Sequence, residues 1–283
     1  MIVDAHQHFW RLDRGDYGWL QPGHVALYRD HLPEHFAQLA ADHQVRATVL
    51  VQAAATEAET RYLLDLATRD PLIAGVVGWI DMEAPDAPRR IAALVADGHG
   101  RLKGIRPMVQ DIADPQWLRS PALDRAFEAL IAHGLVFDAL VEPRHLAALH
   151  ERLQRHRGLR AVLDHAGKPD IAGKNFAGWA EDVTRLAGHA ALYCKLSGLL
   201  TQAADNADVD DLAPFVGHLF EHFGADRMVW GSDWPVLNLR ADYGRWLEMA
   251  RRLASAYAPG HEDAVFANNA IALYGLDIEE GTT

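Results

Sequence analysis

Cysteine is nearly absent from this sequence, and so is any long apolar run. Cys194 is the one cysteine, so no disulfide can form within the chain. A chain without disulfides suits a reducing compartment, and the amino terminus lacks the basic and apolar segments of a secretory signal. No run of about 18 apolar residues is present, so no membrane span is expected. We therefore expect a cytoplasmic protein.

Basic residues are also in short supply, with 27 Lys and Arg against 39 Asp and Glu, a formal net charge of −12. Such a chain repels phosphate backbones, and it contains no basic patch, so we expect no nucleic-acid partner. It lacks the glycine-rich fingerprint of dinucleotide sites, so no nucleotide cofactor is expected. No low-complexity linker divides the chain, which predicts a single domain over residues 1–283. The sequence does not indicate an oligomeric state.

Short apolar runs alternate with amphipathic stretches along the whole chain. Runs that predict strands span residues 2–4, 47–52, 73–80, 102–106, 135–140, 160–164, 191–196 and 228–230. Several are apolar at consecutive positions, which is typical of parallel strands buried on both faces. Helical periodicity marks residues 33–42, 57–69, 87–97, 122–133, 144–156 and 242–257. The pattern predicts a (β/α)8 barrel of the TIM type, regular or distorted, with an open doubly wound sheet as the alternative.

Catalytic residues of such barrels lie at the carboxyl ends of the strands. His6 and His8 follow the first run, His165 follows the sixth and Asp233 follows the eighth. Residues two apart in an extended segment point to the same side, so both early histidines can face one site. Three imidazoles and a carboxylate at one mouth are difficult to explain by packing, because buried polar groups need partners. They are candidate metal ligands or catalytic groups.

Three motifs carry a resemblance to a known family. VDAHQHFW begins at Val3, LDHAGKP begins at Leu163 and WGSDWP begins at Trp230. Together they resemble the amidohydrolase superfamily, and more narrowly its sugar-lactonase branch, which includes L-fuconolactonases and L-rhamnonolactonases. The narrower match rests on residues 10–20, 51–52, 56–60 and 103–106. The resemblance implies a hydrolase that opens a sugar-acid lactone, such as L-fucono-1,5-lactone or a related deoxy or galacto-configured aldonolactone, in L-fucose degradation.

The resemblance also bears on metal content. Many members of the superfamily hold two metals bridged by a lysine or glutamate of strand four, with a further histidine at strand five. Here the fifth run ends in Phe137-Asp138, and Lys103 could bridge only if carbamylated, so a two-metal site is not expected. One divalent ion such as Zn²⁺, on His6, His8, His165 and Asp233, suits nitrogen and oxygen ligands. The lactonase branch includes members that work without metal, so we treat the ion as optional.

Lactone hydrolysis needs an activated water and a stabilised oxyanion. Asp233 is the candidate general base, because a free aspartate is ionised at neutral pH. His6, His8 and His165 are the candidate groups that polarise the carbonyl, directly or through a metal. Asp4 and Asp164 each precede a candidate histidine by one or two positions and either orient the imidazoles or point away.

Five other residues are candidates for substrate binding. Arg106 could clamp a carbonyl or carboxylate, or form an ion pair at the rim. Gln52 could bind a sugar hydroxyl or cap a strand, and Asp138 could accept hydrogen bonds from the substrate. Trp79 and Trp234 could form a wall beneath a sugar ring or serve only in packing.

Two other functions stay open at this stage. A metal-dependent decarboxylase of the same superfamily would share the early histidines and the late aspartate, and carbon dioxide release would distinguish it. A non-catalytic sugar-binding barrel would have no need of a base among electrophiles. The long aromatic loop over residues 9–29 either covers a pocket or packs on the barrel rim.

Overall fold

The computed structural model describes residues 1–278 and contains one parallel sheet whose eight strands follow one another in sequence order. Every strand falls on a predicted run. They are β1 (Ile2–Gln7), β2 (Val45–Val51), β3 (Ile73–Gly78), β4 (Leu102–Ile105), β5 (Val136–Ala139), β6 (Ala161–Leu163), β7 (Leu192–Leu196) and β8 (Met228–Trp230). A bridge joins Gln7 of β1 to Trp234 in the loop after β8, so the barrel is nearly closed. The predicted (β/α)8 barrel is confirmed.

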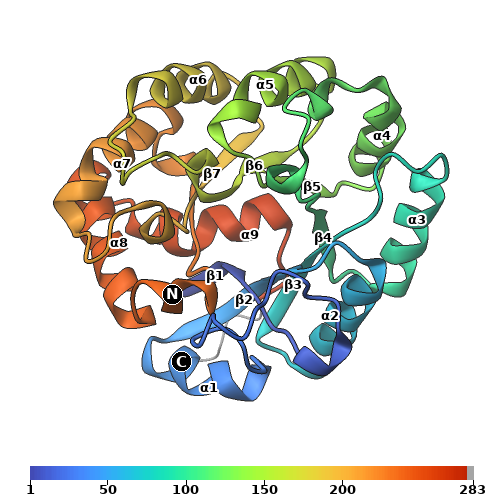
Figure 1. The fold of residues 1–283 in the computed structure, drawn as a ribbon, viewed down its shortest axis with the longest axis horizontal. Helices are drawn as coiled ribbons and strands as arrows, with labels where there is room; N and C mark the ends of the chain where they lie inside the picture. Colours follow the sequence, from blue (N-terminus) through green and yellow to red (C-terminus); the bar gives the residue numbers. More distant parts are fainter. Residues whose placement is uncertain (279–283) are drawn as a thin grey trace.

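Helices surround the strands as an outer ring (Figure 1). They are α1 (Pro33–Asp42), α2 (Glu57–Arg69), α3 (Ala87–Asp97), α4 (Asp124–Ala132), α5 (Leu146–Arg155), α6 (Ala177–Ala187), α7 (Val209–Phe223) and α8 (Tyr243–Tyr257). Side-chain caps define some starts: Thr56 accepts a hydrogen bond from the Glu59 N–H ahead of α2, at 3.0 Å. None of the helices that the structure describes is long and apolar enough to cross a membrane.

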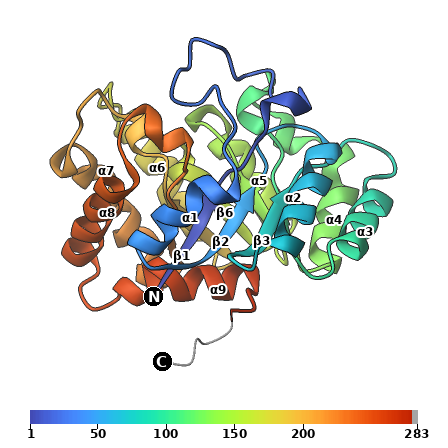
Figure 2. The same ribbon diagram turned by 90° about the horizontal axis from the view of Figure 1, so that it is seen from below.

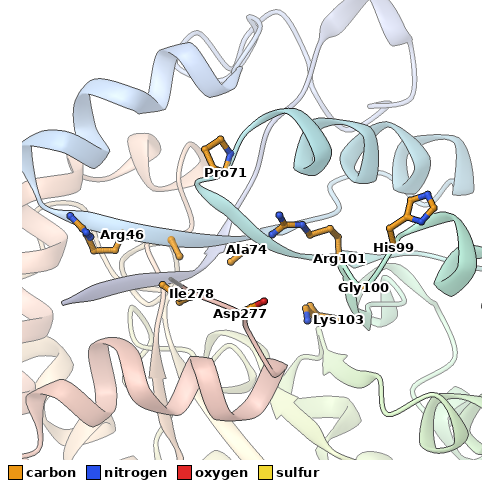
Figure 3. A pocket seen from close by; sticks show the side chains of 10 residues that line it. Arg46, Pro71, Ala74, His99, Gly100, Arg101, Lys103, Asp277 and Ile278 are labelled. Carbon is orange, nitrogen blue, oxygen red and sulfur yellow. The ribbon is translucent and has the colours of Figure 1, made fainter. Parts of the chain in front are cut away.

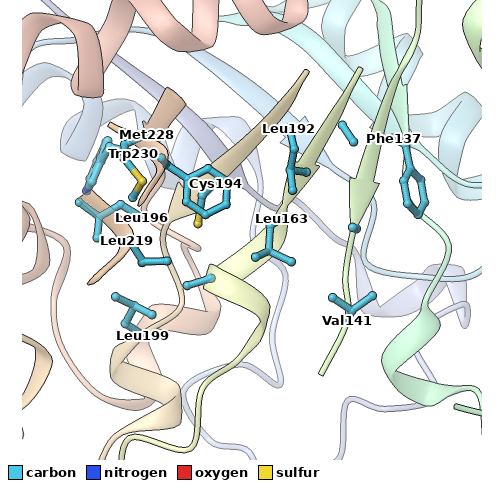
Figure 4. Close-up of a cluster of buried hydrophobic side chains, with 14 of the residues drawn as sticks. Phe137, Val141, Leu163, Leu192, Cys194, Leu196, Leu199, Leu219, Met228 and Trp230 are labelled. Atoms are coloured by element: carbon cyan, nitrogen blue, oxygen red, sulfur yellow. The ribbon is translucent and has the colours of Figure 1, made fainter. Parts of the chain in front are cut away.

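The strands bury apolar side chains on both faces. Outward-facing residues such as Leu163, Cys194 and Trp230 pack against the helices (Figure 4). Inward-facing valines, among them Val136 and Val229, fill the lower barrel above α9 (Asn269–Tyr274). Figure 2 shows α9 beneath the strands and the dark blue segment that follows β1 rising from the opposite end. That opposite end is where the strands finish and where an active site is expected.

The amino-terminal end of the barrel holds a cavity of about 710 Å³, lined by Arg46, Arg101, Lys103 and Asp277 among others (Figure 3). Lys103 Nζ donates to the carbonyl oxygen of Gly275 at 2.8 Å. Lys103 therefore points away from the carboxyl ends of the strands and cannot bridge metals there. The predicted ligands lie at the other end of the barrel.

Candidate active site

The site is built on the seam between β1 and the loop after β8. The Asp233 N–H donates to the His6 carbonyl at 2.7 Å, and the His8 N–H donates to the Trp234 carbonyl at 2.7 Å. Gly231 permits this approach, because a Cβ there would lie 2.6 Å from the Cβ of His6. The backbone thus fixes the distance between the histidine pair and the aspartate.

A strained turn presents His165. Residues 165–168 all have positive φ, a conformation that costs roughly 1–2 kcal/mol for each non-glycine residue. Gly198 lies against the imidazole, where a Cβ would come within 2.4 Å of His165 Nδ1. Strain of this kind persists at functional sites when the surroundings impose it. The turn also brings Lys168 to the same mouth.

The four residues singled out from the sequence converge. The ring centroid of His6 lies 5.0 Å from that of His8 and 4.6 Å from that of His165. Asp233 Oδ1 lies 3.3 Å from His8 Nε2 and 3.7 Å from His6 Nε2. All four side chains are buried. Buried polar atoms aimed at one point require a ligand or a proton between them.

The Nδ1 atoms of His8 and His165 each have a hydrogen-bond partner that orients the imidazole. His8 Nδ1 lies 2.8 Å from the Val51 carbonyl oxygen, which can only accept, so Nδ1 carries the proton and Nε2 is left free to face Asp233. His165 Nδ1 lies 2.9 Å from Ser197 Oγ. Such partners fix the orientation of metal-binding and catalytic histidines.

The residues present fit a single zinc ion. Ligand atoms of His6, His165 and Asp233 lie within 4.8 Å of one another. His8 Nε2 is outside this group of three and lies 3.3 Å from Asp233 Oδ1. Zinc–ligand distances of about 2.0–2.1 Å place tetrahedral ligand atoms about 3.3 Å apart. The separations of 3.3 and 3.7 Å from Asp233 Oδ1 are close to that value. A set of imidazoles with one carboxylate is a usual one for Zn²⁺.

Electrostatics set the protonation of the site. Burial alone would raise the pKa of the Asp233 carboxyl, but His165, His8 and His6 beside it hold that pKa well below its usual range. Burial lowers the pKa of His165 to about 4. Burial and the Lys195 ammonium lower the pKa of His6 well below its usual value. At neutral pH the site therefore holds an ionised aspartate next to the neutral imidazoles of His6 and His165.

Arg106 is fixed at the edge of the site. Its Nη2 donates to the backbone carbonyl of Gln52, and the Gln52 side chain donates back to the Arg106 carbonyl at 2.9 Å. Its Nη1 lies 3.3 Å from His6 Nε2 and 3.5 Å from Asp164 Oδ2. Arg106 Nε is buried and has no hydrogen-bond partner among the residues described.

Lys195 forms the floor of the site, a role that sequence reasoning missed. Its ammonium is fully buried and lies 2.6 Å from Asp138 Oδ2, 2.9 Å from Asp164 Oδ1 and 3.2 Å from His6 Nδ1. The Tyr274 hydroxyl donates to Asp138 at 2.7 Å. The signal in the sequence was a lysine within an otherwise apolar strand, since a charge there needs counter-ions.

Comparison with known proteins agrees with this geometry. The family model described as amidohydrolase matches residues 3–276. The chain belongs to the amidohydrolase family. This amidohydrolase is 43% identical to an L-fucono-1,5-lactonase of Burkholderia ambifaria, over 99% of the chain and 97% of the relative. It is 35% identical to an L-fucono-1,5-lactonase of Burkholderia multivorans, over 97% and 96%.

A solved structure extends the comparison to three dimensions. An amidohydrolase from Burkholderia multivorans, crystallised with bound zinc, is 33% identical to this chain. It matches with a TM-score of 0.90 and covers 98% of this amidohydrolase and 100% of the solved chain.

An inner cavity of about 210 Å³ opens above the convergent residues of this amidohydrolase. Besides His8, His165 and Asp233, its lining includes Arg106 and Lys168. The Lys168 ammonium donates to the Gln110 side chain, and burial lowers its pKa. Sequence reasoning did not single out Lys168, although LDHAGKP contains it.

Trp19 of the 9–29 loop also lines this cavity, so that loop covers the pocket, while a second set of its residues packs together on the rim.

Four of the five candidate substrate-binding residues do not line the inner cavity. Gln52 is fully buried and holds Arg106, and Asp138 is paired with Lys195. Trp234 packs with its ring centroid 5.3 Å from that of Phe36, because the loop after β8 turns it toward α1. Trp79 lines a second, outer cavity.

Asp4 and Asp164, the two carboxylates that could orient the imidazoles, lie in different places relative to the site. Asp164 lies beside Arg106, His6 and Lys195 beneath the site. Asp4 points away: Oδ1 accepts from the Ser232 N–H at 2.9 Å and Oδ2 accepts from the Tyr243 hydroxyl at 3.0 Å. Asp4 therefore holds the Asp233 loop in place without contacting the imidazoles.

Proposed function

We propose that this amidohydrolase hydrolyses L-fucono-1,5-lactone, or a closely related 6-deoxy aldonolactone, to the free acid. The observation that carries the proposal is the ionised Asp233 carboxylate facing three buried imidazoles at the inner cavity. Two relatives at 43% and 35% identity bear the name L-fucono-1,5-lactonase, which supports the choice of substrate. We place the reaction in cytoplasmic L-fucose degradation.

In this mechanism Asp233 accepts a proton from the attacking water, which then adds to the lactone carbonyl carbon. The guanidinium of Arg106 and the ammonium of Lys168, which both line the inner cavity, donate hydrogen bonds to the oxyanion that forms. Asp233 returns its proton to the ring oxygen as the acyl–oxygen bond breaks. A zinc ion held by His6, His8, His165 and Asp233 would add Lewis-acid polarisation of the carbonyl.

The inner cavity also suits a deoxy sugar. Met108, Leu140 and Val236 are apolar residues of its lining, which also includes the charged groups around Asp233. A methyl group packs there without desolvating a hydroxyl. Since apolar pockets reject an added hydroxyl only moderately, we expect L-fucono-1,5-lactone to be preferred over L-galactono-1,5-lactone by about 10- to 100-fold in kcat/KM.

The test is acid release across L-fucono-, L-rhamnono-, L-galactono- and D-gluconolactones, with and without added zinc. Asp233→Asn should keep the fold and lose about 10²–10⁴ in kcat, while Asp205→Asn, a carboxylate 78% exposed, should not change it. Turnover by Asp233→Asn above a tenth of wild type would refute the base assignment. No acid release above the spontaneous rate would refute the lactonase, and carbon dioxide release from aromatic acids would indicate a decarboxylase instead.

A further inference from the structure

A second cavity lies beside the inner one. This outer cavity has a volume of about 430 Å³, twice that of the inner cavity. The two share Trp19, Ala53, Met108 and Asp111 in their linings. The two cavities therefore adjoin along these residues, and a ligand seated against Asp233 that extends past Met108 would enter the outer one.

Three indoles line the outer cavity. Trp19 comes from the loop after β1, Trp79 follows β3 and Trp117 lies between β4 and α4. Trp19 is 38% exposed, and Trp79 and Trp117 are partly exposed, whereas Trp230 and other core tryptophans are fully buried. Large aromatic side chains gathered around one exposed hollow are typical of a ligand-binding surface. Their flat apolar faces match the C–H faces of a pyranose ring.

The charge of the outer cavity indicates which chemical class of ligand it can bind. Its carboxylates are Asp16, Asp81, Glu83 and Asp111, and no lysine, arginine or histidine is among the lining residues that the structure describes. Asp16 is paired with Arg14, but the other three carboxylates have no cation among the described lining residues, so a phosphate or carboxylate ligand would be repelled there. Carboxylates do accept hydrogen bonds from hydroxyl groups. Aromatic faces with carboxylate acceptors at their edges fit a neutral, hydroxyl-rich ring.

We propose that the outer cavity binds a second sugar ring, joined by a glycosidic bond to the lactone in the inner cavity. The inference rests on the proposed function, which places the lactone against Asp233. The reaction is the same hydrolysis: the lactone acyl–oxygen bond breaks, water supplies the acyl hydroxyl and the proton on the released alcohol, and the glycosidic bond is untouched. The substrate class is therefore the glycosylated aldonolactone, as well as the simple one.

The kinetic test compares L-fucono-1,5-lactone with its 3-O- and 4-O-β-D-galactopyranosyl derivatives. Wild type should hydrolyse at least one derivative with kcat/KM no lower than a tenth of that for the parent. Trp117 and Glu83 line only the outer cavity. Trp117→Ala and Glu83→Gln should each lower kcat/KM for that derivative about threefold to tenfold. Each should change kcat/KM for the parent lactone less than twofold. The control is Tyr257→Ala, a 41%-exposed aromatic on α8, which should alter neither.

Two kinetic results would overturn the inference. One is that the enzyme hydrolyses the parent lactone, but kcat/KM for both derivatives is below 1% of kcat/KM for the parent. The other is an equal effect of Trp117→Ala and Glu83→Gln on parent and derivative, since that would indicate a structural role. Glu83 is exposed, so Glu83→Gln tests the inference even if Trp117→Ala does not fold.

A binding measurement separates this inference from the proposed function. Calorimetric titration of lactose, which has no lactone to hydrolyse, into wild type and Trp117→Ala needs no turnover. Binding that weakens at least threefold in Trp117→Ala would support the outer sugar site even if no lactone were hydrolysed, and the proposed function alone would fall. Hydrolysis of the parent lactone with neither lactose binding nor turnover of the derivatives would overturn the outer site alone.

Discussion

Replacing Lys195 by methionine removes the cation that neutralises the floor of the active site. The Lys195 ammonium lies 2.6 Å from Asp138 and 2.9 Å from Asp164, and all three side chains are fully buried. Removing one partner of a buried ion pair leaves an uncompensated charge, which typically costs about 3–5 kcal/mol. Total stabilities of about 5–15 kcal/mol make this a large fraction. We expect Lys195→Met to lower the free energy of unfolding, measured with urea at pH 7.5, by about 3–5 kcal/mol.

The pH dependence of that loss tests its electrostatic origin. In wild type, burial and the neighbouring Asp164 raise the pKa of Asp138 to about 6 even though Lys195 opposes them. Without Lys195 the native state should take up protons on these carboxyls more readily than the unfolded state, so the loss should shrink as the pH falls toward 5. Adding Asp138→Asn to Lys195→Met should recover more than 1 kcal/mol. A loss below 1 kcal/mol at pH 7.5, or one unchanged between pH 7.5 and 5, would refute the reasoning.

Three further predictions concern other parts of the barrel. Gly198→Ala places a methyl group 2.4 Å from His165 Nδ1, so kcat should fall about 10²-fold with circular dichroism unchanged; an unaltered kcat would contradict this. Burial lowers the pKa of His31 to about 4 while unfolded histidine titrates near 6.5, so wild type should lose about 1–2 kcal/mol more than His31→Gln between pH 7.5 and 5, and equal losses in urea unfolding would count against it. Burial raises the pKa of the Cys194 thiol, so a thiol reagent should label it only as the protein unfolds; fast labelling of native protein would refute that.

The sequence predicted the barrel well because its strands are apolar on both faces. Helix starts marked by a capping residue or a proline, such as Thr56 before α2 and Pro33 in α1, were placed correctly. Helices α6, α7 and α9 were not predicted, and α7 contains Pro214, a residue that is unfavourable inside a helix. The His6, His8, His165 and Asp233 cluster could be foreseen because each residue ends an apolar run, and a barrel brings strand ends together.

The substrate-facing residues were harder to foresee, because strand position does not tell where a side chain points at a loop. Trp79 and Trp234 both follow strands, yet one lines the outer cavity and the other packs on Phe36. Lys168 reaches the inner cavity only because residues 165–168 adopt left-handed backbone conformations. Such a turn is unfavourable for non-glycine residues, so local propensity predicts against it.

The seam between β1 and the loop after β8 has a consequence for synthesis of the chain. His8 and Asp233 are separated by 225 residues and meet only across this seam. A ribosome must therefore release most of the polypeptide before Asp233 and the histidines can come together. A nascent chain that has folded its first half-barrel still lacks the candidate site, which is assembled only when the first and last strands join.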